Sequence, residues 1–364
     1  NYLKNGTAGS TQIDTSLDVW DGIWDTGQMD RFDQSIGATY QLPFKFIPLL
    51  SFLDGTYSYT GNFNWQRGST ALANVVDENN NSLGIVHTLQ NANTIQWNGS
   101  ANMQALYNSL GLRKNTKKSD KKKAGVQIKN SLIGAVTALR RVQFSYSENN
   151  GTVLPGYTQN IGFLGTANPG IAFALGRQDD IRFEAAKRGW LTEFPNFNQA
   201  YTTVHNNEIS YNAEIGLLQG LQLDLTGNRS YSENNSENFS VVNGVYNALS
   251  PRLFGNFEIS TIMLRTSFSG NGLASTAFED LKTNRLIIAE RLGTARGIPA
   301  GNVDADGFPT GYGKTNQAVL IPAFLAAYTG ADPNSVSMDA KRSFPLPNWN
   351  MQYTGFMRLK SFKK

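Results

Sequence analysis

The chain has 364 residues, no cysteine and a formal net charge of +4. Without cysteine there is no disulfide framework and no thiolate chemistry. The modest charge gives little support to a nucleic-acid-binding function, because six of the lysines lie in one short stretch, 114–123. A mean hydropathy of -0.35 and the lack of an apolar run of about 18 residues exclude a helical membrane protein.

Charged residues make up 16% of the chain, below the roughly 25% that is usual for soluble domains. Aromatic residues reach 11%, and there are 35 glycines. Low charge together with many Asn, Gln, Ser and Thr residues is typical of a polar but uncharged surface. The stretch from Lys114 to Lys123 is interpreted as a solvated loop rather than as a specific anion-binding site.

Several short segments alternate apolar and polar residues almost without error. In 57–67, for example, Tyr57, Phe63 and Trp65 fall on one parity, and Asn62 and Asn64 on the other. Successive side chains of a β-strand point to opposite faces, so the alternation predicts strands with one apolar and one hydrated face. The predicted strands are 31–42, 57–67, 94–107, 140–148, 208–218, 221–231, 253–262 and 349–360.

Strands of this length, aromatic on one face and amide-rich on the other, predict an all-β membrane protein. The predicted fold class is part of the wall of an antiparallel transmembrane β-barrel, and residues 1–364 belong to one barrel domain. The residues predicted to line a pore are Ser58, Thr60, Asn62, Asn64, Gln96, Asn98, Ser100, Asn102, Gln104, Asn212, Glu214, Asp224, Asn350 and Gln352. The residues predicted to face lipid are Tyr57, Phe63, Trp65, Ile95, Trp97, Met103, Tyr211, Leu223, Trp349 and Tyr353.

The shortest connection orients the predicted sheet. Gln219-Gly220 joins two predicted strands, and a two-residue connection ending in glycine is a strong hairpin signal. Outer-membrane barrels have short periplasmic turns and longer extracellular loops, so this turn is predicted to be periplasmic. The connections then placed on the periplasmic side are 43–56, 108–139 and 263–348, and those placed outside the cell are 68–93, 149–207 and 232–252.

Two long connections are predicted to be insertions. Residues 149–207 form an extracellular or luminal insertion, and 263–348 form an insertion with short helices. Within the second, 275–292 begins with a capping-box pattern from Thr276 to Glu279 and carries an apolar stripe of helical spacing. Its stripe consists of Phe278, Leu281, Ile288 and Leu292. A short apolar segment, 317–328, is predicted to be a second helix that packs against the wall, because it is too short to span a bilayer.

A search for catalytic chemistry finds little. His87 and His205 fall in predicted loops without metal-ligand spacing, which favours an ordinary surface role. The run 311–315 ends like a phosphate-binding loop but has Phe308 where the leading glycine is required. Asp304 and Asp306 resemble the start of a calcium loop. The glutamate needed at the twelfth position is missing, so an acidic turn is the preferred interpretation and calcium the alternative. We expect no enzymatic activity and no cofactor.

The ends of the chain suggest that it is an internal piece of something larger, or a processed chain. The first residues have neither a basic region nor an apolar region of a signal peptide. The last residues, 361–364, lack the terminal aromatic on which bacterial barrels commonly end.

Three stretches resemble the SprA (Sov) family of giant outer-membrane proteins: 142–157 (VQFSYSENNGTVLPGY), 321–328 (IPAFLAAY) and 347–355 (PNWNMQYTG). The resemblance spans most of this chain but only a fraction of the family's length. Members are translocons of the type IX secretion system in gliding and periodontal bacteria. The resemblance implies a single-chain barrel of roughly 36 strands with a lateral opening, located in the bacterial outer membrane. It also implies a PorV-type shuttle protein, a periplasmic plug protein and secreted cargo proteins as partners.

The leading hypothesis is therefore a protein-conducting outer-membrane channel that passes folded cargo to the cell surface. An uncharged wall fits this function, because a conduit must release what enters it. One alternative is a self-contained porin or transporter barrel. Another is an extracellular carbohydrate-binding or adhesive β-protein, which would require solvent-facing aromatics with paired carboxylates nearby. The channel hypothesis predicts that 31–42 and 349–360 do not pair with each other, since eight strands would close too narrow a barrel.

Overall fold

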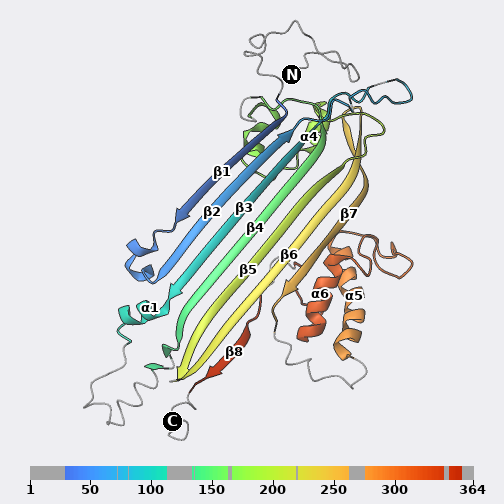
Figure 1. Cartoon of the computed structure of the whole chain (residues 1–364). Coiled ribbons are helices and arrows are strands. Elements are labelled where there is room, and N and C mark those ends of the chain that lie inside the picture. Colours follow the sequence, from blue (N-terminus) through green and yellow to red (C-terminus); the bar gives the residue numbers. More distant parts are fainter. Residues whose placement is uncertain are drawn as a thin grey trace, which may run out of the picture.

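A computed structural model describes residues 29–71, 73–80, 82–112, 133–134, 136–162, 166–218, 220–261, 275–339 and 344–354. Its main feature is one antiparallel sheet in which β1 to β7 lie side by side in chain order (Figure 1). The strands are β1 (Arg31–Gln41), β2 (Leu53–Gln66), β3 (His87–Asn102), β4 (Leu139–Tyr157), β5 (Ala200–Leu218), β6 (Leu221–Val242), β7 (Val245–Ile259) and β8 (Asn348–Tyr353). The all-β, antiparallel part of the predicted fold class is confirmed.

The pairing register explains the alternation in the sequence. Tyr57 pairs with Trp97, Trp97 with Tyr146, and Tyr146 with Ile209, so these side chains share one face of the sheet. We call it the apolar face, and the opposite one the polar face. The register places the predicted pore-lining residues of the strands on the polar face and the predicted lipid-facing ones on the apolar face. For the residues that lie in strands, the two groups thus fall on opposite faces, and their contact with a lumen and with lipid stays a prediction.

Met103 and Gln104 are exceptions, because the predicted strand 94–107 is wrong at its end. The strand stops at Asn102, and α1 (Met103–Ser109) follows. The side chain of Asn102 accepts a hydrogen bond from the backbone N–H of Ala105, at 3.3 Å, and so caps the helix. Alternation that continues by chance into a helix misled the sequence analysis here.

The strands extend further at the other end than the alternation indicated. β4 continues to Tyr157 and β5 begins at Ala200, so the insertion between them is 158–199 rather than 149–207. The predicted extracellular loop 232–252 is also wrong, because β6 and β7 run through it and form a hairpin. Asn243 and Gly244 make the turn with positive φ angles of 52° and 74°, the pair of values that two-residue hairpins of this twist require.

The seventh position of the sheet is filled by two segments rather than one. β7 pairs with the part of β6 from Arg229 to Val242, and β8 pairs with the part from Leu221 to Thr226. Both are antiparallel to β6, so β7 and β8 are collinear and lie one after the other along the edge of β6. The segment 260–347 is therefore an insertion between two collinear strands, and we call it the excursion. Its predicted placement as 263–348, a connection at the end of two neighbouring strands, is wrong.

The excursion carries the two helices expected from the sequence. α5 (Thr276–Ala295) and α6 (Gln317–Thr329) confirm the predicted segments 275–292 and 317–328. The cap of α5 is Ser275 rather than the capping box expected one residue later, and Phe278 is exposed instead of lying on the packed stripe. A small core joins the helices and consists of Ile288, Ala289, Phe308, Tyr312, Val319 and Ala323.

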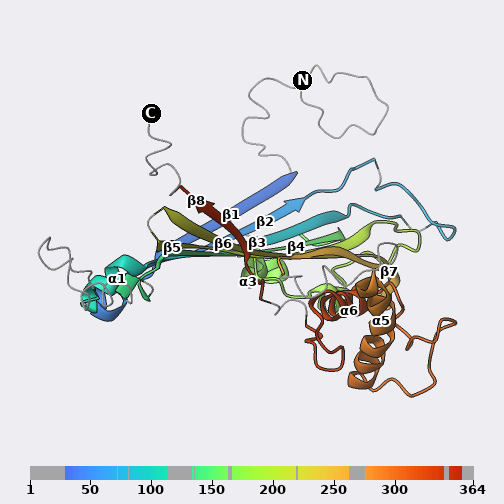
Figure 2. The same cartoon turned by 90° about the horizontal axis from the view of Figure 1, so that it is seen from below.

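The shorter helical elements lie in the loops and insertions. Two 3₁₀ turns, η1 (Phe44–Phe46) and η2 (Pro48–Leu50), join β1 to β2. The insertion between β4 and β5 holds η5 (Thr166–Gly170), α3 (Ile171–Ala174) and α4 (Arg182–Lys187). Figure 2 shows α1, α3, α5 and α6 on the same side of the sheet. Among the described residues, no helix is both long and apolar enough to cross a membrane.

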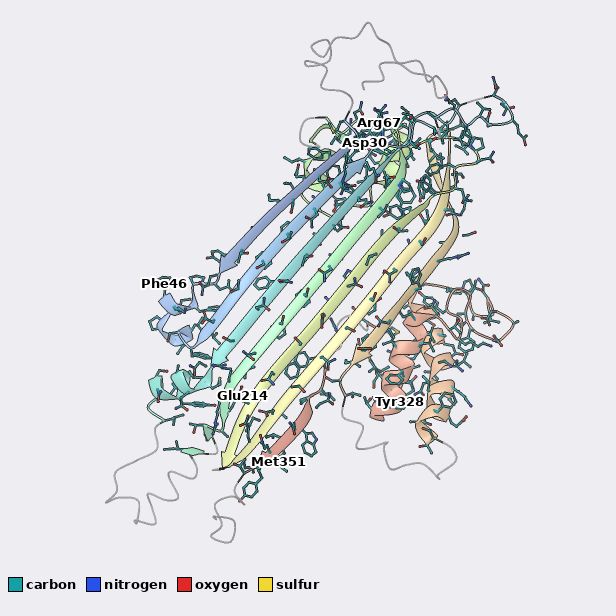
Figure 3. The ribbon with its side chains drawn as sticks, viewed as in Figure 1. Asp30, Phe46, Arg67, Glu214, Tyr328 and Met351 are labelled. Carbon is teal, nitrogen blue, oxygen red and sulfur yellow. The ribbon has the colours of Figure 1, made fainter. Side chains whose placement is uncertain are left out.

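The sheet does not close on itself. Within the described ranges β1 pairs only with β2, and β8 pairs only with β6. The expectation that 31–42 and 349–360 do not pair with each other is confirmed for these residues. The strands have two recognisable ends. At one end Arg67 donates a backbone hydrogen bond to Asp30, and Phe46, Glu214 and Met351 lie toward the opposite end (Figure 3).

Candidate functional site: a two-faced wall

The polar face is a lattice of uncharged side chains over most of its area. Neighbouring strands are linked by side-chain hydrogen bonds, such as Thr94 Oγ1 to Asn149 Oδ1 at 2.8 Å and Ser145 Oγ to Asn98 Oδ1 at 2.9 Å. These groups satisfy one another only in part and keep capacity for water. Such a face is hydrated and presents few charges.

The apolar face has three zones along the strands, and the first lies at the end of the sheet near Gly220. We call this zone the belt. On β5 it runs from Ile209 to the end of the strand at Leu218, which is roughly the length of strand that crosses a bilayer at a tilt. Its side chains are Tyr57, Ile95, Trp97, Val142, Phe144, Ile209, Tyr211, Ala213, Ile215, Leu223, Leu225, Trp349, Met351 and Tyr353.

Part of the belt is not covered by the described parts of the chain, although Tyr211 stacks on Phe344 with a centroid distance of 5.3 Å. The side chains of Trp97 and Phe144 are 41% and 39% exposed, and Trp349, Met351 and Tyr353 are exposed on β8. A contiguous apolar surface of this kind marks a contact with another molecule or with a membrane, because soluble proteins rarely expose one.

The second zone is a line of polar groups that crosses the strands above the belt. Asn93 pairs with Asn150, Asn150 with His205, and His205 with Glu233, so one row of polar residues runs across β3 to β6. We call it the seam. The Nδ2 group of Asn150 donates to Asn93 Oδ1 at 2.9 Å, and Asn150 Oδ1 lies 2.5 Å from Nδ1 of His205.

A second row of bonds supports the seam on its belt side. The hydroxyl of Tyr146 donates to Glu148 at 2.6 Å, and Asn207 Nδ2 donates to the Tyr146 oxygen at 2.8 Å. Arg229, whose side chain is fully buried, donates to Asn207 Oδ1. Polar groups withdrawn from water are tolerated where they bond to one another in this way.

The strand boundaries correct the sequence interpretation of both histidines. His205 lies inside β5, in the seam, and His87 is buried at the first residue of β3, so neither lies in a loop. The ring of His87 packs against Trp65 with a centroid distance of 4.5 Å. The described residues hold no cluster of acidic or histidine side chains suited to a metal ion.

The third zone is a protein core beneath the insertion 158–199. Phe63 and Trp65 are only 1% and 2% exposed and pack with Leu89, Leu154 and Phe173. The prediction that Phe63 and Trp65 face lipid is therefore wrong, because the insertion covers them. The sequence could not separate the two cases, since protein and hydrocarbon select the same apolar residues on a strand face.

Two asparagines fasten the insertion to the sheet. Asn91 Nδ2 donates to the carbonyls of Phe173 and Arg177, at 2.7 and 2.9 Å, and Asn93 Nδ2 donates to the carbonyl of Gly176 at 2.8 Å. Glycine is required at the contact: Gly176 has a φ of 97°, and a Cβ there would lie 2.7 Å from the Cα of Gly61.

A charged clamp holds the far side of the insertion. Arg182 donates to Asp180 at 2.7 Å and also to the buried carboxylate of Glu237, and its guanidinium lies 4.4 Å from the ring centre of Tyr201. The hydroxyl of Tyr246 donates to the same Glu237 at 2.7 Å. The hydrogen bonds from Arg182 lower the pKa of Asp180 below its usual value.

The remaining candidates from the sequence have structural roles. Asp304 Oδ1 accepts the backbone N–H groups of Asp306 and Phe308, both at 2.9 Å, and Asp306 forms a 2.9 Å ion pair with Lys314. The preferred interpretation as an acidic turn agrees with these contacts. The lysine-rich stretch 114–123 and Gln219 lie outside the described residues, although Gly220 has the positive φ, 85°, that a tight turn requires.

The sequence analysis missed the seam and the clamp. A signal for the seam existed in three polar triplets that interrupt the alternation: 148–150 (ENN), 206–208 (NNE) and 233–235 (ENN). The register sets 148–150 opposite 205–207 and Glu233 opposite His205, which the sequence alone does not show. A scan against protein-family models finds no matching family, and a search of curated proteins finds no relative.

Proposed function

We propose that this chain forms a stretch of the wall of an outer-membrane β-barrel, and that the barrel is the protein-conducting channel of a type IX secretion system. The belt carries the proposal. The belt is an exposed apolar surface on one face of the sheet, and the polar face opposite it is hydrated and largely uncharged. Each strand contributes about ten residues to the belt region. The belt faces lipid, and the polar face lines the lumen.

The open edges support a barrel larger than the described strands. Rows of unpaired N–H and C=O groups in hydrocarbon cost roughly several kcal/mol per group, so β1 and the β7/β8 line require further strands as neighbours. A self-contained porin made of these strands would need β1 to pair with β8, and no such pairing occurs among the described residues. The channel proposal therefore has more support than the porin alternative.

Strand length supports a wall that extends well beyond the bilayer. β6 has 22 residues, which corresponds to roughly 70 Å along the strand, whereas the apolar band of a barrel is roughly 25 Å tall. With Gly220 on the periplasmic side, the seam lies near the outer surface of the membrane. The part of the wall covered by the insertion 158–199 then stands outside the cell, where a protein cover replaces lipid.

The resemblance to the SprA (Sov) family gives the proposal its partners. A PorV-type shuttle, a periplasmic plug protein and secreted cargo proteins are the proposed partners, and the outer membrane is the proposed location. The polar face suits the passage of folded proteins, because neutral amides and hydroxyls bind proteins weakly. We assign the chain no catalytic step, so the energy for transport comes from elsewhere.

Site-specific photocrosslinking in secreting cells tests the proposal. A crosslinking amino acid at Asn98 samples the polar face, and one at Phe144 samples the belt on the neighbouring strand. We expect Asn98 to crosslink to secreted cargo and Phe144 to lipid. Cargo crosslinks at Phe144 but not at Asn98 would reverse the two faces. A lack of cargo at Asn98, in cells whose secretion depends on this protein, would refute the channel function.

A further inference from the structure

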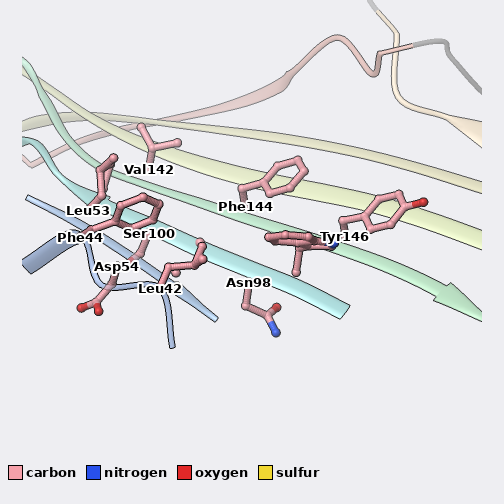
Figure 4. Close-up of a pocket in the computed structure, with 13 residues that line it drawn as sticks. Leu42, Phe44, Leu53, Asp54, Asn98, Ser100, Val142, Phe144 and Tyr146 are labelled. Atoms are coloured by element: carbon pink, nitrogen blue, oxygen red, sulfur yellow. The ribbon is translucent and has the colours of Figure 1, made fainter. Parts of the chain in front are cut away.

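An apolar groove is cut into the belt where the β1–β2 loop folds back over the sheet. It has a volume of about 430 Å³ and is lined by Leu42 and Phe44 from the loop side, Leu53 and Trp97 from β2 and β3, and Phe144 from β4 (Figure 4). This volume is within the range of small-molecule binding sites.

The groove offers its occupant almost no polar side chain. In Figure 4 the side chains of Asp54 and Asn98 point away from Val142 and Phe144, as strand alternation requires. The hydroxyl of Tyr146, at the far end, is already bonded to Glu148. An occupant of this groove is therefore a hydrocarbon rather than a sugar, a nucleotide or a polar peptide.

Two paired glycines make the groove deep. Gly55 and Gly99 pair across β2 and β3, so neither strand places a side chain on the apolar face at this level. A Cβ at Gly55 would meet Leu42 and Phe44 at 2.8 and 2.9 Å, so that end is closed by packing. A Cβ at Gly99 would meet only the carbonyl of Asp54, at 3.8 Å, so the space above Gly99 is the open groove.

The rim has the chemistry of a membrane interface. The β1–β2 loop exposes Phe46 and Leu49, which are 87% and 71% exposed and are backed by Ile47. Lys45 of the same loop has its ammonium 3.5 Å from the carboxylate of Asp54, so it lies toward the polar face rather than over the groove. Exposed aromatic and aliphatic side chains beside an apolar slot match the acyl chains of a lipid.

We propose that this groove binds one acyl chain of a membrane phospholipid. The proposal rests on the proposed function, because it requires the belt to face a bilayer. The groove is continuous with the belt and the exposed loop lies at its end, so a chain from the bilayer enters without crossing polar surface. The bound chain fills the surface that the two glycines leave bare.

Fluorescence quenching by brominated lipid tests the groove. Trp97 lines the groove and packs its other side against Tyr57, 4.6 Å away between ring centres, so it reports occupancy directly. The intact protein in detergent is titrated with a phospholipid that carries bromine on its acyl chain. The Trp97 contribution is the signal lost in the Trp97→Phe variant. Trp349, exposed on the belt outside the groove, gives the reference in the same way.

We expect quenching of Trp97 to saturate near about one lipid per protein, whereas quenching of Trp349 follows the lipid content of the micelle. Gly99→Leu fills the groove and should abolish the saturable part. Gly151→Leu is the matched control: a Cβ there also meets only one carbonyl, that of Asn91 at 3.8 Å, but it lies on the polar face. It should leave quenching unchanged.

Vesicles made of the brominated lipid separate the two proposals. Suppose that both tryptophans are quenched in vesicles. If Trp97 then shows no saturable phase in detergent, or one that survives Gly99→Leu, the groove proposal is refuted and the proposed membrane wall is not. Absence of quenching at both Trp97 and Trp349 in vesicles overturns the wall itself. A saturable phase removed by Gly99→Leu and retained in Gly151→Leu supports the groove.

Discussion

Phe63→Ala provides the sharpest test of where protein, rather than lipid, covers the apolar face. Phe63 is 1% exposed, and its ring lies 6.1 Å from that of Phe173 in the insertion 158–199, edge to face. Truncation removes roughly 150 Å² of buried apolar surface, which at about 25 cal/mol per Å² amounts to about 4 kcal/mol. Measured costs of Phe→Ala in protein cores, about 3–5 kcal/mol, agree with this value.

The loss should appear first in the insertion, because Phe63 is one of its main contacts with the sheet. Hydrogen exchange of the Thr158 and Thr192 amides, which donate to Trp190 O and Gly156 O, measures the opening of that unit. A loss of 4 kcal/mol corresponds to exchange faster by about a thousandfold. Phe144→Ala is the control on the same face, and we expect at most about a tenfold effect on these amides, because no described residue of the insertion covers Phe144. Equal effects of the two substitutions would refute the protein cover.

Three further predictions concern the clamp, a close contact and the orientation. Arg182 lowers the pKa of Asp180, so Asp180 contributes its full stabilisation above the usual carboxyl pKa of about 4 and loses it as the pH falls below that value. Hydrogen exchange of the insertion should therefore accelerate in acid, and Asp180→Asn should remove that pH dependence. Gly227→Ala should destabilise the protein by about 1–3 kcal/mol in denaturant titrations, because the added Cβ collides with the ring of Tyr211, whereas the same change at Gly37, an open position, should cost less than about 1 kcal/mol. A cysteine at Asn243 should react with an impermeant reagent on whole cells and one at Ser51 should not; the reverse pattern would invert the orientation.

The faces of the strands could be predicted from the sequence because alternation is a local property. Tyr57 and Trp97 fall on the same parity in their own segments, and the register places them opposite each other. The helices α5 and α6 were also predictable, since periodicity and caps are encoded within a few residues. Both kinds of signal depend only on which side of an element is buried.

What covers an apolar face could not be predicted. Trp65 and Trp97 have the same alternating surroundings in the sequence, yet one lies beneath the insertion and the other is bare. The difference depends on contacts such as Asn91 with Phe173, which are far apart in the chain. The collinear strands β7 and β8 escaped prediction for the same reason, because their alignment is set by pairing with β6 and not by either segment alone.

The seam shows how part of this missing information could be recovered from sequence. A polar triplet in one strand reads as a loop, and both 149–207 and 232–252 were misplaced for that reason. When polar runs occur in consecutive strands and one register sets Asn150 opposite His205 and His205 opposite Glu233, a loop is the poorer interpretation, because Asn150 and His205 then bond across the sheet. A hydrocarbon phase cannot extend past such a row, since it would strip water from a carboxylate. The seam therefore separates two parts of the apolar face, and beyond it the apolar residues, Phe63 and Trp65 among them, are covered by protein.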